Sequence, residues 1–299
     1  MSIDRRNFLK SGLSLAGAAT LASCPVFPWI TRAGELTANA PLLAIASGES
    51  PAENVRRAFQ ALGGIEKFVK QGSKVFLKPN SFSKLSEDFA INTNPAVVGE
   101  VARLCRLAGA SQVIAATHDE DVWEVNGIGA ALKAEGVLYR SANRRRDYQP
   151  VALPKGKILA KTEMLKELIE ADVFINIPVL KHSPEVYLTA GLKNTMGLNW
   201  DRQIMHQIGL HQTIADLASF RIPDVTVIDC TRILLSNGPY GPGEVRRANQ
   251  VLASGDPVAA DAYAATLLKL EPREVDHIRF ASDLGLGEMD VKKIEIRLV

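Results

Sequence analysis

The sequence contains little cysteine, which excludes the metal centres that several cysteines usually build. Only Cys24, Cys105 and Cys230 occur in 299 residues, and no two of them are spaced as Cys-x-x-Cys. Iron–sulfur clusters and structural zinc sites need closely spaced thiolates. We therefore expect no iron–sulfur cluster bound by the chain's own cysteines. Cys105 and Cys230 fall in apolar patterns and are expected as small buried residues, with no disulfide indicated by their spacing.

An excess of charge of either sign is also lacking. Without residues 1–23, the chain has 32 basic and 32 acidic residues. A nucleic-acid-binding domain usually carries a basic excess on one face. The run Arg144–Arg146 is explained as part of a solvated loop. Nucleic acid is therefore not an expected partner.

Four common catalytic and nucleotide-binding signatures are absent as well. The sequence has no G-x-S-x-G, G-x-x-x-x-G-K-[ST], H-E-x-x-H or G-x-G-x-x-G. These patterns mark a nucleophile elbow, a phosphate-binding loop, a zinc-protease helix and a dinucleotide-binding turn. There is also no internal repeat and no low-complexity segment. Motifs of this kind therefore do not identify a reaction, and the question of enzymatic activity stays open.

The apolar run at the N-terminus is short and follows a pair of arginines. Residues 4–10 read DRRNFLK, and residues 11–23 form a weakly apolar run. Such a run is too short to span a bilayer and has the length of a signal-peptide core. The pattern predicts a twin-arginine signal, read by the Tat translocase, with export of the folded protein to the periplasm or another extracytoplasmic space. The competing interpretation is an ordinary amphipathic N-terminal helix.

Two interpretations of the cleavage site remain open. Residues 21–24 read LASC, which fits a lipobox with a lipid on Cys24, although Pro25 follows directly. Cleavage after a small residue near Ala33 or Ala38 is the alternative. We expect a signal peptide and leader over residues 1–33 and a linker over residues 34–41. Attachment to a membrane is expected only through a lipid on Cys24.

Residues 42–299 are expected to form a single α/β domain, with a mainly parallel or mixed sheet and helices on both faces, in one body or two lobes. The basis is the alternation of short apolar runs with amphipathic helical patterns. Pro178 is expected to end one buried strand, and residues 147–164 to form a small insertion or hairpin. The expected strands are Leu42–Ala46, Lys74–Leu77, Val113–Ala116, Val137–Tyr139, Val173–Ile177, Val225–Ile228, Val251–Ala253 and Ile294–Leu298. The expected helices include Pro51–Gln71, interrupted at Gly63-Gly64, one opened by Asn94-Pro95, Ile128–Glu135, Ile204–Phe220, one opened by Asp256-Pro257, and Glu274–Asp283.

Polar residues follow several of these expected strands directly. In an open α/β sheet, ligands bind outside the carboxyl ends of the strands, so polar groups placed there can converge. Any one of these residues is also explained as an ordinary loop residue, and the prediction depends on their convergence. The residues are Lys78, Asn80, His118, Asp119, Lys181, His182, Lys193, Asn194 and Asp229.

The residue types suit an anion or a metal with an anion. Ammonium groups, amides and glycine-flanked backbone bind carboxylate or phosphate, and we assign this role to Lys78, Asn80, Thr189, Lys193, Asn194 and Gly197. Imidazole and amine groups suit proton transfer, and the catalytic candidates are Lys181, His182 and His118. The candidate metal ligands are His118, Asp119, His182 and Asp229. His206 and His211 are five apart on one expected helix and are therefore not expected to share a metal.

Three segments together carry a resemblance to a known family. They read VFLKPN at residues 75–80, NIPVLKHSPEVYLTAGLKNTMG at 176–197 and GPYGPGEVRRANQVLASGDPVAADAYAATLL at 238–268. In order and spacing, from about Leu42 to the C-terminus, the chain resembles the Domain of Unknown Function 362 family. The resemblance points to the lysine, histidine, threonine, asparagine and glycine positions of these motifs, and adds Asp256 and Asp261. We interpret Asp256 as a helix cap and Asp261 as a carboxylate in an early helical turn, where the helix dipole favours it.

The resemblance also bears on cofactors and partners. Members of that family often occur in iron–sulfur proteins, commonly with a ferredoxin-like module that has cysteine repeats, and this chain lacks those cysteines. A redox partner could carry the cluster instead. Two functional hypotheses follow. One is an exported protein with a strand-end site for an anionic small molecule or a metal–anion cofactor, with a redox connection. The other is a non-enzymatic accessory or electron-transfer partner of an exported complex that holds an iron–sulfur cluster or another cofactor.

Overall fold

The computed structural model describes residues 40–299. The twin-arginine motif, the lipobox at Cys24 and the alternative cleavage positions near Ala33 and Ala38 lie outside the described residues. Among residues 40–299, no helix has both the length and the apolar character needed to cross a bilayer.

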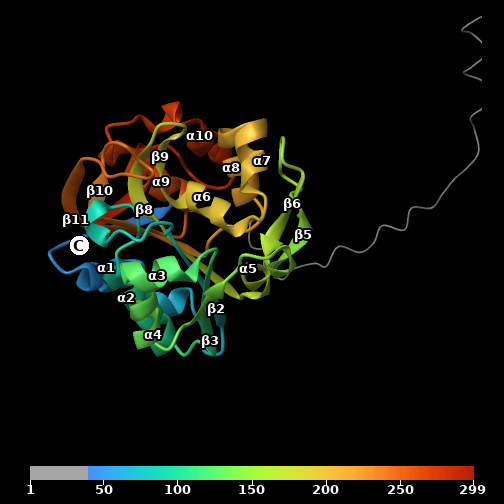
Figure 1. Ribbon diagram of the computed structural model, residues 1–299. Helices are drawn as coiled ribbons and strands as arrows, with labels where there is room; N and C mark the ends of the chain where they lie inside the picture. The colour runs from blue at the N-terminus through green and yellow to red at the C-terminus, as the bar shows by residue number, and fades with distance from the viewer. Residues whose placement is uncertain (1–39) are drawn as a thin grey trace, which may run out of the picture.

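A ten-stranded mixed sheet forms the centre of the protein (Figure 1). Its main path runs β12-β1-β11-β10-β7-β2-β3-β4, with β8 paired to β10 and β9 paired to β8. The run β10-β7-β2-β3-β4 is parallel, and β11 is antiparallel to both β1 and β10. The α/β prediction is confirmed. The strands are β1 Leu42–Ser47, β2 Lys74–Pro79, β3 Gln112–Thr117, β4 Leu138–Ser141, β7 Val173–Ile177, β8 Val179–Ser183, β9 Tyr187–Thr189, β10 Val225–Leu234, β11 Val245–Ser254 and β12 Glu295–Leu298.

Helices cover both faces of the sheet, as expected (Figure 1). α1 to α4 lie below the sheet in this view, and α6 to α10 lie above it. Each face has its own buried apolar cluster, with Cys105 in one and Cys230 in the other, and both thiols are free. The helices are α1 Pro51–Ala61, α2 Pro95–Leu107, α3 Glu120–Asn126, α4 Ile128–Ala134, α5 Lys166–Glu170, α6 Gly191–Asn194, α7 Arg202–Ile208, α8 Leu210–Ala218, α9 Pro257–Leu267 and α10 Asp276–Asp283.

The residues that open α2 and α9 act as the sequence predicts. The Asn94 side chain accepts from the Ala96 backbone N–H at 2.9 Å, and Asp256 accepts from the first N–H groups of α9. Each is followed by a proline, whose fixed φ suits the first helical position and whose missing N–H costs nothing there. β5 Tyr148–Ala152 and β6 Lys161–Leu165 form a separate antiparallel hairpin, which confirms the expectation for residues 147–164.

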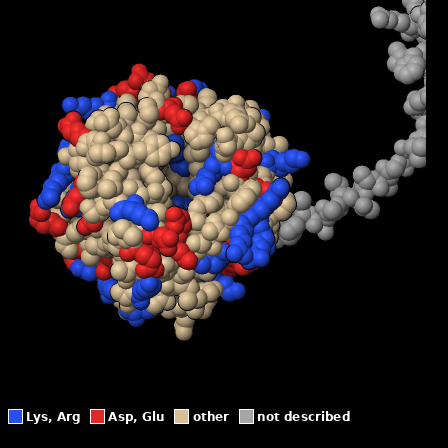
Figure 2. Space-filling view, viewed as in Figure 1, with Lys and Arg blue, Asp and Glu red and all other residues tan. Residues whose placement is uncertain are grey.

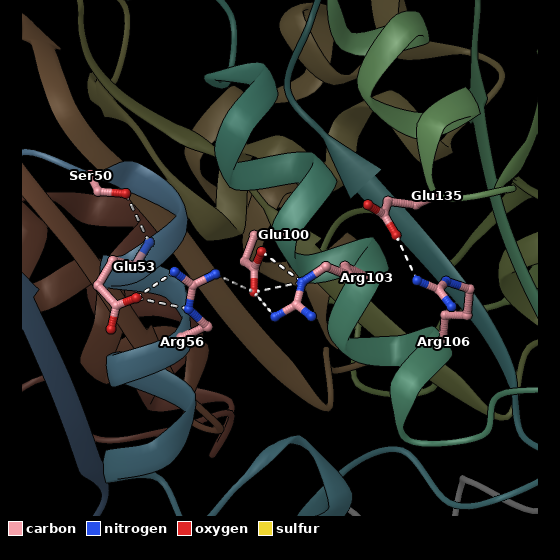
Figure 3. A network of polar contacts seen from close by, with 7 residues as sticks. All are labelled: Ser50, Glu53, Arg56, Glu100, Arg103, Arg106 and Glu135. Carbon is pink, nitrogen blue, oxygen red and sulfur yellow. Dashed lines mark hydrogen bonds and ion pairs between the residues drawn. The ribbon is translucent and has the colours of Figure 1, made fainter.

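Ion pairs connect α1 to α2 on one side of the sheet (Figure 3). Glu100 of α2 has a nearly buried side chain and accepts from Arg103 on its own helix at 2.7 Å. Arg56 of α1 reaches the same carboxylate at 3.2 Å and also pairs with Glu53. Exposed pairs contribute little singly, but a shared, shielded carboxylate holds the two helices in register.

Three expectations about element ends were wrong. Pro178 does not end the strand pairing: it only separates β7 from β8, and both lie parallel to β10. Because β10 continues to Leu234, Asp229 and Cys230 lie within this strand and not at its end. The helix expected at Ile204–Phe220 is two helices, α7 and α8, because Gly209 adopts a φ of +130° between them. His206 and His211 thus lie on different helices.

Candidate functional site

The site lies at the end of β2. At this point β7, the neighbour of β2 in the sheet, is followed along the chain by β8. The backbone N–H of Asn80 still donates to the Ile177 carbonyl at 3.2 Å, after which the chain leaves the sheet. It returns at Thr93, whose N–H donates to the Asn80 carbonyl at 2.8 Å. The loop between these two residues contacts the side chain that β8 places at Lys181. A buried lysine is therefore enclosed between the sheet and this loop.

Lys181 is fully buried, with no exposed surface. Its Nζ donates to Asn80 Oδ1 at 2.8 Å and to the Ile91 carbonyl at 2.6 Å, and it lies 4.2 Å from the centre of the Phe82 ring. Burial, together with the charges of Lys193 and Lys78, holds the pKa of Lys181 well below its usual value. A neutral amine has two N–H groups, which matches the two carbonyl acceptors.

A chain of amides positions Lys181. Asn80 Nδ2 donates to Asn194 Oδ1 at 2.8 Å, and Asn194 Nδ2 donates to Asn176 Oδ1 at 2.7 Å. Asn194 Nδ2 also reaches the Lys78 carbonyl at 3.0 Å, and Asn176 Nδ2 donates to the Gly191 carbonyl at 2.8 Å. Because the amide groups of Asn80 and Asn194 are used by one another and by the backbone, their main effect is to hold β2, β7, β8 and α6 together.

Lys78, from the end of β2, is the second lysine of the site. It is 8% exposed, and its Nζ donates to the carbonyl of Pro79 at 2.7 Å. Gly197 lies against this side chain, since a Cβ there would be 2.9 Å from Lys78 Cε. Burial, reinforced by the charge of Arg202, lowers the pKa of Lys78 to about 7. An ammonium has three N–H groups, so protonated Lys78 retains two for a ligand.

Basic side chains gather here without an acidic partner. Among residues 40–299, no ion pair within 4 Å involves Lys78, Lys181, Lys193 or Arg202. Lys193 is half-buried on α6, where burial lowers its pKa and the charge of Glu185 partly offsets this. Figure 2 shows this face hollowed near the position of α6, with Lys or Arg atoms visible inside.

An open cavity of about 490 Å³ adjoins Arg202, the first residue of α7. We call it the Arg202 hollow; its lining residues are Trp200, Asp201, Arg202, Gln203 and His206. Asp201 is the acidic residue among them, and its side chain caps α7 by accepting from the Ile204 N–H at 3.1 Å.

His118, from the loop after β3, lies within reach of the same charges. Its Nε2 is 3.2 Å from the hydroxyl of Tyr148, and burial, with the charges of Arg202 and Lys78, lowers its pKa to about 4. The imidazole is therefore neutral at pH 7. His118 therefore lies within electrostatic reach of Lys78 and Arg202.

His182 is directed away from Lys181. The two residues are consecutive in β8, and successive side chains of a strand point to opposite faces of the sheet. The backbone of Gly238 packs on the His182 carbonyl, and the buried His182 Nδ1 has no hydrogen-bond partner among the described residues. Because Lys181 and His182 belong to a strand and not to a loop, they do not share one site.

The four candidate metal ligands do not form a centre. Asp119 caps α3 by accepting from the Asp121 N–H, and Asp229 accepts from the backbone N–H groups of Asn94 and Thr231. Asp229 thus connects β10 to the start of α2. Within residues 40–299, no group of three or more histidine, cysteine, aspartate or glutamate side chains is arranged to hold a metal.

The remaining motif residues mainly stabilise the fold. Thr189 pairs with Lys181 in the β8–β9 ladder, and its buried Oγ1 has no hydrogen-bond partner among the described residues. Asp256 caps α9 with bonds of 2.8 Å and also accepts from the Glu288 N–H at 2.9 Å, which agrees with its interpretation as a cap. Asp261 is fully buried and accepts from the N–H groups of Gly191 and Leu192, a role that its position in the helix did not indicate.

Sequence reasoning missed several residues of this region. Arg202 was assigned to no site because it follows no strand, and Phe82 and Tyr240 lie in irregular loops without periodicity. His277 is fully buried, and neither of its ring nitrogens has a hydrogen-bond partner among the described residues. Its ring centre lies 5.6 Å from that of His211. The dense glycine and proline content around the single tyrosine of residues 237–243 was the available signal for Tyr240.

The chain is similar to a curated relative and, more distantly, to a solved structure. The chain is 27% identical over 249 residues to the thylakoid-associated protein sll1697 of Synechocystis sp. (strain ATCC 27184 / PCC 6803 / Kazusa), covering 78% of this chain and 75% of the relative. The lactate racemase apoprotein from Thermoanaerobacterium thermosaccharolyticum aligns with a TM-score of 0.45 and 11% identity. That alignment covers 75% of this chain but only 56% of the solved chain.

The family assignment rests on a match to a family model. The family described as Domain of unknown function (DUF362) matches residues 75–266, well over half of the chain. All three segments that carry the resemblance fall within or overlap this range. The chain therefore belongs to the DUF362 family.

Proposed function

We propose that this protein binds a small anion, a carboxylate or a phosphate, at the edge of the sheet where β2 ends. The observation that carries the proposal is the pair of buried lysines, Lys78 and Lys181, with Arg202 nearby and no acidic partner within ion-pair distance among the described residues. Buried positive charge is costly unless it is paired. An anionic ligand would supply the missing partner.

The available donors suggest where the anion contacts the protein. Lys181 already donates to two carbonyl oxygens, whereas Lys78 donates to only one. The Arg202 guanidinium forms no ion pair within the part of the chain that the structure describes, and its planar fork suits carboxylate and phosphate. We therefore assign direct contacts to Lys78 and Arg202. Lys181 adds a positive potential whenever it is protonated.

Proton transfer at this site would fall to His118 or Lys78. Both have pKa values lowered by burial, to about 4 and about 7, so each has a neutral nitrogen available near or above neutral pH. A neutral amine or imidazole next to a bound acid can act as a general base. Catalysis is thus an extension of the binding proposal and is not needed to explain the cluster of charges.

We expect Arg202→Met to weaken the binding of phosphate and of malonate by roughly 10- to 100-fold, the effect of losing a charged hydrogen bond. Isothermal titration calorimetry on the protein without residues 1–39 measures both probes. Arg146→Met, at an exposed arginine on the loop before β5, is the matched control and should bind like wild type. Equal loss in both variants would indicate general charge attraction and would contradict the assignment.

We also propose export through the twin-arginine route, supported by the DRRNFLK motif at residues 4–10. Replacement of Arg5-Arg6 by Lys-Lys should leave uncleaved precursor in the cytoplasm, because the Tat translocase reads the arginine pair. Fractionation and immunoblotting of tagged protein measure this. Normal processing of the Lys-Lys variant would contradict the proposal. The relative's description as thylakoid-associated supports a place of action at a membrane.

The accessory role remains the competing proposal. Native mass spectrometry of protein purified from its own cells separates the two: a bound organic anion supports the binding site. A stable complex with an iron–sulfur protein and no bound anion supports the accessory role.

A further inference from the structure

An exposed pair of aromatic rings lies over the buried lysine. Phe82 is 40% exposed and Tyr240 is 74% exposed, and their ring centres are 5.4 Å apart at an interplanar angle of 79°. The other side of Phe82 contacts Lys181, whose Nζ is 4.2 Å from the ring centre. The two rings therefore lead from the buried Lys181 to the protein surface.

The backbone holds this pair in position. Tyr240 lies in the loop between β10 and β11, and two glycines of that loop pack closely on the site. A Cβ at Gly238 would overlap the His182 carbonyl, and a Cβ at Gly241 would be 2.7 Å from the Ile91 side chain. Ile91 also provides the carbonyl that accepts from Lys181. The close packing of these two glycines fixes the path of the loop, and the ring of Tyr240 stays exposed.

A second aromatic group lies near Arg202. Tyr148 is 5.3 Å from Trp200 and 6.1 Å from His118, measured between ring centres. Trp200 also lines the Arg202 hollow. Burial raises the pKa of Tyr148, and the charge of Arg202 opposes this rise. Burial lowers the pKa of Arg202, and Tyr148 and Tyr240 oppose this, so the guanidinium lies within electrostatic reach of both tyrosines.

We propose that the anion bound here is a planar aromatic acid, with its acidic group on Lys78 and Arg202 and its ring against Phe82 and Tyr240. This inference rests on the proposed anion site and adds the class of ligand. Aromatic side chains bind a flat ring in stacked or edge-to-face contact, with a gain beyond the burial of area. The Arg202 hollow, about 490 Å³, gives Arg202 open space beside it, and roughly 300–1,000 Å³ is typical of small-molecule sites.

The test compares two acids that differ in aromaticity. 2-Naphthoate and decalin-2-carboxylate have the same carbon skeleton and charge, but only the first is flat and aromatic. We expect 2-naphthoate to bind at least tenfold more tightly in calorimetric or NMR titrations. Tyr240→Leu and Phe82→Leu should each remove most of this preference, and Tyr240→Leu should leave the affinity for phosphate unchanged. Tyr187→Leu, at an exposed tyrosine of β9, is the control and should keep the preference.

The outcomes separate this inference from the anion site itself. If both acids bind equally, or if the Leu variants keep the preference, the aromatic ligand class is wrong while the anion site stands. If Arg202→Met binds 2-naphthoate as tightly as wild type, the carboxylate does not contact Arg202. The acid then binds elsewhere, and the inference is overturned. If phosphate, malonate and both acids all fail to bind, the proposed function itself fails.

Discussion

Lys78→Met is expected to reduce the affinity for phosphate and malonate by about 100-fold at pH 6, where the wild-type lysine is protonated. The reason is that Lys78 is the buried cation with free N–H groups and no acidic partner within 4 Å among the described residues. Methionine keeps the length and apolar character of the side chain but has no charge. Titration calorimetry measures the affinity, and Lys74→Met, at the exposed first residue of the same strand, is the matched control.

The wild-type protein should show a matching pH dependence. Because the folded pKa of Lys78 is about 7 and the usual value is 10.5, the unfolded chain holds a proton that the folded chain has released between these pH values. The free energy of unfolding therefore rises with pH over this window, by an amount on the order of 4 kcal/mol for a fully buried lysine. Affinity for the anion should fall as pH rises through 7. Denaturant melts and titrations from pH 6 to 9 measure both trends.

The Lys78→Met variant should lose this contribution to both pH trends. It should also be more stable than wild type at pH 7 and below, since the cost of burying the ammonium disappears. A variant that binds anions like wild type, with the same dependence on pH, would show that Lys78 does not contact the ligand.

Asp261→Ala is expected to lower the free energy of unfolding by roughly 3 kcal/mol, because it leaves two buried N–H groups without acceptors at about 1–3 kcal/mol each. The carboxylate accepts from the N–H groups of Gly191 at 2.7 Å and Leu192 at 2.9 Å, and thus fixes the start of α6. The same helix carries Asn194, which positions the lysines. Anion affinity should therefore fall together with stability. Thermal and urea melts measure the first effect, and titration with phosphate measures the second.

The pH dependence of this carboxyl has the opposite sign to that of Lys78. Burial raises the pKa of Asp261 to about 7, above its usual 3.8, so the folded chain retains a proton between these values that the unfolded chain has lost. Stability contributed by Asp261 is present below pH 4 and is lost as pH rises through 7. Asp283→Ala, at an exposed carboxylate of α10, should change neither stability nor its pH trend. A stable Asp261→Ala variant with wild-type binding would contradict the anchoring role.

The sequence alone predicted the elements whose cause is local. The apolar β-branched run of β7, the Asn94-Pro95 and Asp256-Pro257 starts of α2 and α9, and the alternation of strand and helix depend on neighbouring residues. The sequence also predicted Lys78 as a site residue, since it directly follows three apolar strand residues. The twin-arginine motif is another local signal, and it stays a prediction.

Only the tertiary structure decided which of the predicted polar residues meet. Pro178 interrupts one strand, but pairing with β10 continues in β8, so Lys181 is buried in the sheet and His182 faces the other side. Asn80 and Asn194 are 114 residues apart and hydrogen-bond to each other, while Arg202, Phe82 and Tyr240 reach the site from elements that no periodic pattern places there. Long-range pairing determines these contacts, because the register of strands and the path of loops depend on the whole sheet and not on neighbouring residues.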